Sequence, residues 1–130
     1  MKIVQVNFSD SIGGVAIAVK RIHNTLLENN VNSILVVSEQ NDHNSNIFSI
    51  NKTSETIKNT IKSSISRQLK YIFKTENKNT HSLNIISSNN LDLINSLKPD
   101  YVNLDWIGNE TISISDSKKI IQKYLAFLET

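Results

Sequence analysis

The chain has 130 residues with no cysteine, and its 14 lysines and arginines nearly balance 12 aspartates and glutamates. This length allows one domain with a single core. The missing cysteines exclude a disulfide framework, a thiol nucleophile and a thiolate zinc site, and the net charge of +2 does not predict a nucleic-acid-binding protein.

The first predicted elements form one β-α-β unit. Residues 2–8 alternate between apolar and polar side chains, which is typical of a strand. Gly13 and Gly14 follow, and from Val15 to residue 28 the apolar side chains recur at helical spacing. Residues 33–38 contain a continuous apolar run, which is typical of a strand buried on both faces of a parallel sheet.

Further strands and helices are predicted along the rest of the chain. We expect a short strand at 47–50, a helix at 53–74, an extended segment at 83–86, a helix at 91–97, a strand at 101–106, and a last helix that Ser115 and Asp116 cap and that runs to Phe127. This alternation predicts an α/β fold with a parallel sheet, and right-handed crossovers favour a Rossmann-like arrangement.

The helix predicted at 53–74 carries isoleucines along one face and lysines on the other. A basic amphipathic helix can lie on an anionic membrane surface, so peripheral membrane contact is one interpretation. The alternative, which we favour, is a helix that packs its isoleucines into the core. No apolar stretch is long enough for a signal peptide or a membrane span, and we expect a cytoplasmic protein.

Gly13 and Gly14 lie between the first strand and the first helix. At this position backbone N–H groups and the helix dipole can bind a phosphate or another anion. The pattern is not GxGxxG, and no lysine with a following serine or threonine completes a P-loop. A tight turn that requires glycine is an equally good interpretation.

Several segments resemble the amino-terminal part of family 4 glycosyltransferases of the GT-B fold, in particular those of bacterial polysaccharide clusters. The matching segments are residues 1–7, 13–16, 21–27, 82–85, 99–108 and 112–114. The resemblance implies transfer of a sugar from a nucleotide-sugar to a glycan or lipid-linked acceptor. It also implies that this domain binds the acceptor, and that a second Rossmann-like domain makes most donor contacts.

The resemblance suggests roles for two pairs of residues. It places Gly13 and Gly14 beside the donor phosphates, and Asp105 and Trp106 at the carboxyl end of a strand, where open parallel sheets bind ligands. Asp105 stands where the family usually has histidine, and a carboxylate does not offer the same neutral donor and acceptor pair. For Trp106, packing at the end of the sheet is the favoured alternative to a platform for a sugar.

The carboxyl-terminal residues differ most from the family pattern. Residues 121–130 stand where the family has a strand and then a tryptophan and histidine-aspartate segment, and no segment of this sequence resembles the donor domain. We therefore expect a truncated, incomplete domain spanning 1–130 that is inactive alone. The alternatives are a binding or interaction module without catalysis, completion by a separately encoded donor domain, and a homodimer formed through an exposed sheet edge.

The other titratable residues form no recognisable catalytic pattern. His23, His43 and His81 lack the spacing of a metal site or of a base and nucleophile pair, and we expect all three at the surface. Glu110 is expected to be a solvated loop carboxylate. The sequence therefore predicts no catalytic residue, no metal and no cofactor.

Overall fold

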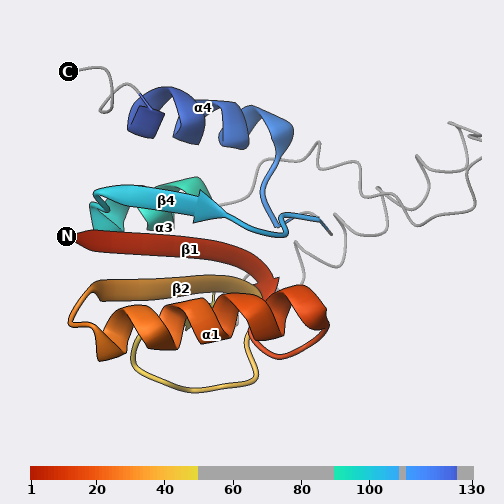
Figure 1. The fold of residues 1–130 in the computed structure, drawn as a ribbon. Helices are drawn as coiled ribbons and strands as arrows, with labels where there is room; N and C mark the ends of the chain where they lie inside the picture. The colour runs from red at the N-terminus through yellow and green to blue at the C-terminus, as the bar shows by residue number, and fades with distance from the viewer. Residues whose placement is uncertain (50–89, 109–110, 126–130) are drawn as a thin grey trace, which may run out of the picture.

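The computed structural model describes residues 1–49, 90–108 and 111–125 (Figure 1). The helix predicted at 53–74, the extended segment predicted at 83–86, and Glu110 lie outside the described residues.

The described strands form one parallel sheet in the order β3-β2-β1-β4. The strands are β1 (Lys2–Ser9), β2 (Asn32–Glu39), β3 (Ile47–Ser49) and β4 (Tyr101–Leu104). Val4 of the central strand β1 lies opposite Ile34 of β2 on one side and Val102 of β4 on the other. The predicted α/β fold with a Rossmann-like parallel sheet is confirmed.

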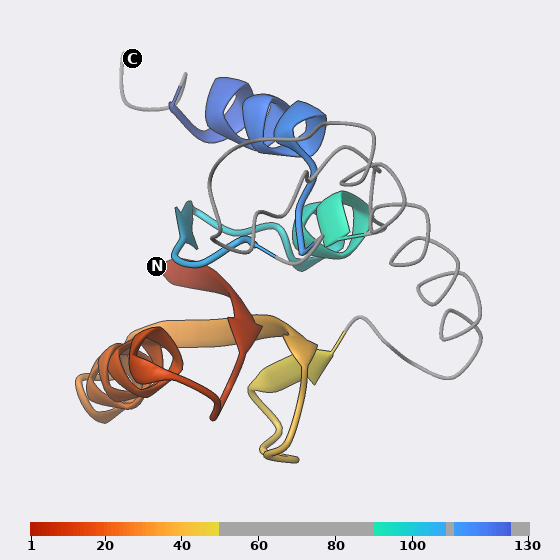
Figure 2. The same cartoon turned by 90° about the vertical axis from the view of Figure 1, so that its right-hand side faces the viewer.

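Helices cover both faces of the sheet. They are α1 (Gly14–Glu28), α3 (Asn90–Leu97) and α4 (Ile114–Leu125). Figure 2 shows α1 on one face and α3 on the other, with α4 beyond β4. None of the described helices is long and apolar enough to cross a membrane.

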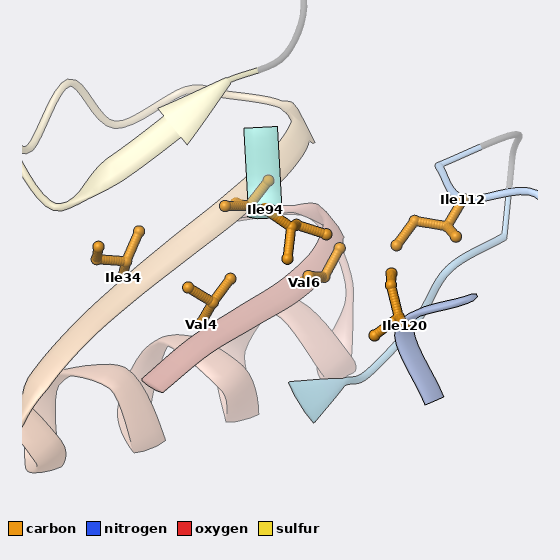
Figure 3. Close-up of a cluster of buried hydrophobic side chains, with 7 residues drawn as sticks. Val4, Val6, Ile34, Ile94, Ile112 and Ile120 are labelled. Carbon is orange, nitrogen blue, oxygen red and sulfur yellow. The ribbon is translucent and has the colours of Figure 1, made fainter. Parts of the chain in front are cut away.

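The two faces of the sheet have separate apolar cores, because successive side chains of a strand point to opposite faces. Leu35 and Val37 of β2 pack with Val19 of α1 on one face. The cluster on the other face joins β1 and β2 to α3 and α4 (Figure 3), and its buried members are Val4, Val6, Ile34, Val36, Ile94, Ile112 and Ile120. This second core holds α3 and α4 to the sheet.

Two predicted element boundaries are wrong. Helix α4 begins after Ser113, whose hydroxyl accepts a hydrogen bond from the Asp116 backbone N–H at 3.0 Å and donates one to the Asp116 carboxylate at 2.8 Å. Ser113 is therefore the N-cap, two residues before the predicted Ser115. Strand β4 ends at Leu104, since the backbone N–H of Trp106 bonds to a side chain instead of continuing the ladder.

Candidate functional site at the carboxyl edge of the sheet

All the strands end at one edge of the sheet because they are parallel. From β1 the chain proceeds to β2 and β3 on one side, whereas β4 lies on the other side. The strand order thus changes direction between β1 and β4, and open parallel sheets bind ligands at such a switch point. Figure 1 shows the carboxyl ends of β1 and β4 at the same edge. Gly13 and Gly14 follow β1 in the chain and Asp105 and Trp106 follow β4, so both predicted pairs belong to segments that leave this edge.

Buried polar residues at the end of β1 connect the two pairs. The Asn7 side-chain oxygen accepts a hydrogen bond from the Trp106 backbone N–H at 3.1 Å, and the Asn7 amide donates one to the Ser9 carbonyl at 2.7 Å. The Ser9 hydroxyl then accepts from the Ile12 backbone N–H at 3.1 Å. Asn7 and Ser9 are each 1% exposed, so these bonds fix the start of the glycine loop relative to the end of β4.

The two glycines have different conformations. Gly13 is the N-cap of α1, with φ 92° and ψ 165°, a region that is essentially restricted to glycine. Gly14 is the first residue of the helix and has no such requirement. A Cβ built on either glycine meets no atom within 4 Å. Because no side chain caps α1, its first N–H groups are available to water or to an anion.

Asp105 is partly buried at the end of β4. Its backbone N–H donates to the Val6 carbonyl at 3.0 Å, and its Oδ1 accepts a hydrogen bond from the Asn103 amide at 2.9 Å. Oδ2 is buried, and none of the residues that the structure describes donates a hydrogen bond to it. Burial raises the pKa of Asp105, and the bond from Asn103 offsets only part of this effect. The described residues therefore leave one carboxyl oxygen of Asp105 without a hydrogen-bond donor.

Trp106 packs against its neighbours and also remains accessible. Its ring lies edge-on to Phe8, with centroids 5.3 Å apart and an interplanar angle of 78°. A Cβ on Gly108 would lie 3.0 Å from the indole Nε1, so the glycine allows the chain to pass close to the ring. The side chain is nevertheless 43% exposed, which leaves part of the indole open to a ligand.

We compared the chain with known proteins. No family model, curated protein or solved structure matches it. Within the described ranges no three histidine, aspartate or glutamate side chains are placed to hold a metal ion. The assignment of a function therefore depends on the geometry of this edge and on the resemblance of the segments above.

Asp10 belongs to the same edge and was not predicted as a site residue. It is fully buried, and its carboxylate accepts hydrogen bonds from the backbone N–H groups of Asn41 at 2.9 Å and Asp42 at 2.7 Å. Burial would raise the pKa of Asp10, but hydrogen bonds from Asp42, Asn41 and Ser11 outweigh it and hold the pKa below its ordinary value. Asp10 thus ties the glycine loop to the segment that follows β2.

The prediction for His23 is wrong. This residue is 1% exposed on α1, because it lies four residues after the buried Val19 on the face that packs on the sheet. That spacing was the available sequence signal. His43 is exposed as expected, and His81 lies outside the described residues.

Proposed function

We propose that this chain is the acceptor-side domain of a GT-B glycosyltransferase that transfers a sugar from a nucleotide-sugar to a glycan or lipid-linked acceptor on the cytoplasmic side of the membrane. The supporting observation is that the segments with Gly13 and Gly14 and with Asp105 and Trp106 both leave the carboxyl edge of the sheet, where hydrogen bonds of Asn7 and Ser9 connect them. The resemblance of the segments supplies the chemistry. Donor contacts would come from a second domain, so these residues alone would bind without transferring.

Each member of the edge has a role in this proposal. The N–H groups after Gly13 would face the phosphates of the donor. The Asp105 carboxylate would turn toward the edge and accept a hydrogen bond from an acceptor hydroxyl, because no described residue donates to its buried Oδ2. The exposed part of Trp106 would lie against the apolar face of a sugar ring.

The alternative is an interaction module without catalysis. Exposed apolar residues on α1 favour it, since Val15 is 46% and Ile22 is 49% exposed. These two residues are seven positions apart and so lie on one side of the helix, where a protein partner could cover them.

Fluorescence of the single tryptophan provides the test, because Trp106 lies at the proposed site. The protein is titrated with UDP, with UDP-glucose and with methyl glycosides of glucose, galactose and N-acetylglucosamine. We expect a saturable change in emission with at least one glycoside. Asp105→Asn should weaken that binding by about tenfold, the loss expected when a hydrogen bond to a charged group is replaced by one to a neutral group.

Glu28→Ala is the matched control, because Glu28 is exposed at the other end of α1. An equal effect of both substitutions, or no response to any of these compounds, would contradict the proposed acceptor site. Sugar transfer by the isolated chain would contradict the proposed need for a second domain.

A further inference from the structure

A cluster of three polar side chains is buried between α1 and the sheet. Gln5 belongs to β1, His23 to α1 and Ser33 to β2, and none of the three is more than 1% exposed. Polar groups in such a position require hydrogen-bond partners to offset their lost hydration. The cluster therefore determines how firmly α1 is held against the two central strands.

Ser33 lies at the centre of the cluster. Its hydroxyl oxygen is 2.8 Å from Nδ1 of His23, and it accepts a hydrogen bond from the Gln5 amide at 3.3 Å. A neutral imidazole can accept the serine proton at Nδ1 and so satisfies both groups. A protonated ring would instead donate from both nitrogens, and the serine hydroxyl would have to accept twice and turn its own proton elsewhere.

The other ring nitrogen has no acceptor in the described part of the chain. Nε2 of His23 and Oε1 of Gln5 are both buried, and no described group bonds to either atom. In the neutral ring that accepts at Nδ1, Nε2 already carries the hydrogen. Protonation at Nδ1 would make this unpaired N–H part of a charged imidazolium that no described group compensates. An uncompensated charge in this position costs far more than a neutral unpaired atom.

The charges around the cluster also oppose protonation. Burial lowers the pKa of His23, and Lys20 one turn earlier on α1 lowers it further. Lys20 is paired with Asp42 at 2.8 Å, outside the cluster. From the sheet, β1 and β2 contribute the neutral Gln5 and Ser33, so in the described part of the chain no carboxylate is bonded to the ring.

The remaining charged residues of these elements do not change this balance. On α1, Arg21 and Glu28 are exposed. On β1, the Lys2 ammonium donates to the Leu97 carbonyl of α3, which lies on the other face of the sheet, and Glu39 is exposed at the end of β2. Among residues 1–49, 90–108 and 111–125, none therefore provides a counter-charge for an imidazolium.

We propose that His23 is an acid-sensitive latch, which holds α1 on the sheet while its ring is neutral and releases the helix when the ring is protonated. Because Gly13 and Gly14 form the start of α1, release also displaces the glycine loop from the carboxyl edge. This inference is independent of the proposed function, since it concerns only the attachment of the helix.

Amide hydrogen exchange between about pH 7.5 and about pH 5.5 tests the latch, after correction for the intrinsic pH dependence of exchange. We expect the amides of α1 to lose about tenfold or more of their protection on acidification, while those of β1 and β2 lose less. His23→Gln, which keeps a neutral hydrogen-bonding side chain, should abolish the difference. His43→Gln, at an exposed position, should retain it.

Two results would overturn the proposal: α1 protection in the wild type that does not depend on pH, or the same pH dependence in His23→Gln. If His23→Gln does not fold, a nuclear magnetic resonance titration of the wild-type ring decides. The latch requires the ring to gain its proton together with the loss of α1 protection. A ring that titrates at its ordinary pKa with α1 still protected contradicts it.

Discussion

Gly13 and Gly14 are adjacent and chemically identical, yet alanine should have opposite effects at the two positions. At Gly13 it forces a side chain into φ 92° and ψ 165°, which costs about 1–3 kcal/mol. No atom lies within 4 Å of the added Cβ, so collision adds nothing to this cost. At Gly14, alanine occupies an ordinary first helical residue and reduces the freedom of the unfolded chain, which stabilises by about 0.4–1 kcal/mol.

The two variants should therefore differ in free energy of unfolding by about 1.5–4 kcal/mol, with wild type between them. Urea unfolding followed by far-ultraviolet circular dichroism measures this difference, provided that the slope against urea is unchanged. Equal urea midpoints for the two variants would refute this prediction, because the loop could not then hold Gly13 at a positive φ. Since both substitutions add the same methyl group, a general effect of size or hydrophobicity cannot account for opposite signs.

Three further predictions concern the core, the helix cap and the loop anchor, and urea unfolding tests all of them. Ile94→Ala removes a fully buried side chain and should lower the free energy of unfolding by about 2–5 kcal/mol. Ile121→Ala, at a 49% exposed position, should change it by less than about 0.5 kcal/mol. Similar losses in the two variants would contradict the burial of Ile94 in the core. Ser113→Ala should lower the free energy of unfolding by about 1 kcal/mol, whereas Ser115→Ala should change it very little. The reverse result would mean that Ser115 is the N-cap, as the sequence predicted. Asp10→Ala should cost about 3 kcal/mol at neutral pH. The pKa of Asp10 is lowered from 3.8 in the folded state. The stability that Asp10 contributes is therefore fully present above pH 3.8 and is lost as the pH falls through the lowered pKa. A cost of Asp10→Ala that stays constant in acid would contradict the role of the charged carboxylate.

The β-α-β unit could be predicted because its patterns are strong and local. Residues 2–8 and 33–38 correspond to β1 and β2 within two residues at either end, and Gly13 stands where the backbone requires glycine. The location of Gly13 and Gly14 at the same edge as Asp105 and Trp106 also followed from the sequence, since it needs only parallel strands and chain order.

The remaining features depend on contacts between segments that are distant in the sequence. Ser113 and Ser115 both precede a helical pattern, and only the bonds between Ser113 and Asp116 distinguish the two candidates for the cap. His23 is polar, but its burial depends on Ser33 in the next strand. The bridging role of Asn7 requires Trp106, which lies 99 residues later in the chain.

The pairing of β1 with β4 has a consequence for folding kinetics. Val4 lies opposite Val102, whereas its other neighbour, Ile34, is much closer along the chain. Closing a longer loop costs more entropy, and non-local pairing slows folding. We expect the β1-α1-β2 segment to assemble first and β4 to join afterwards. A nascent or partly folded chain would then carry the glycine loop without Asp105 and Trp106, and the complete edge would exist only after the last strand has joined the sheet.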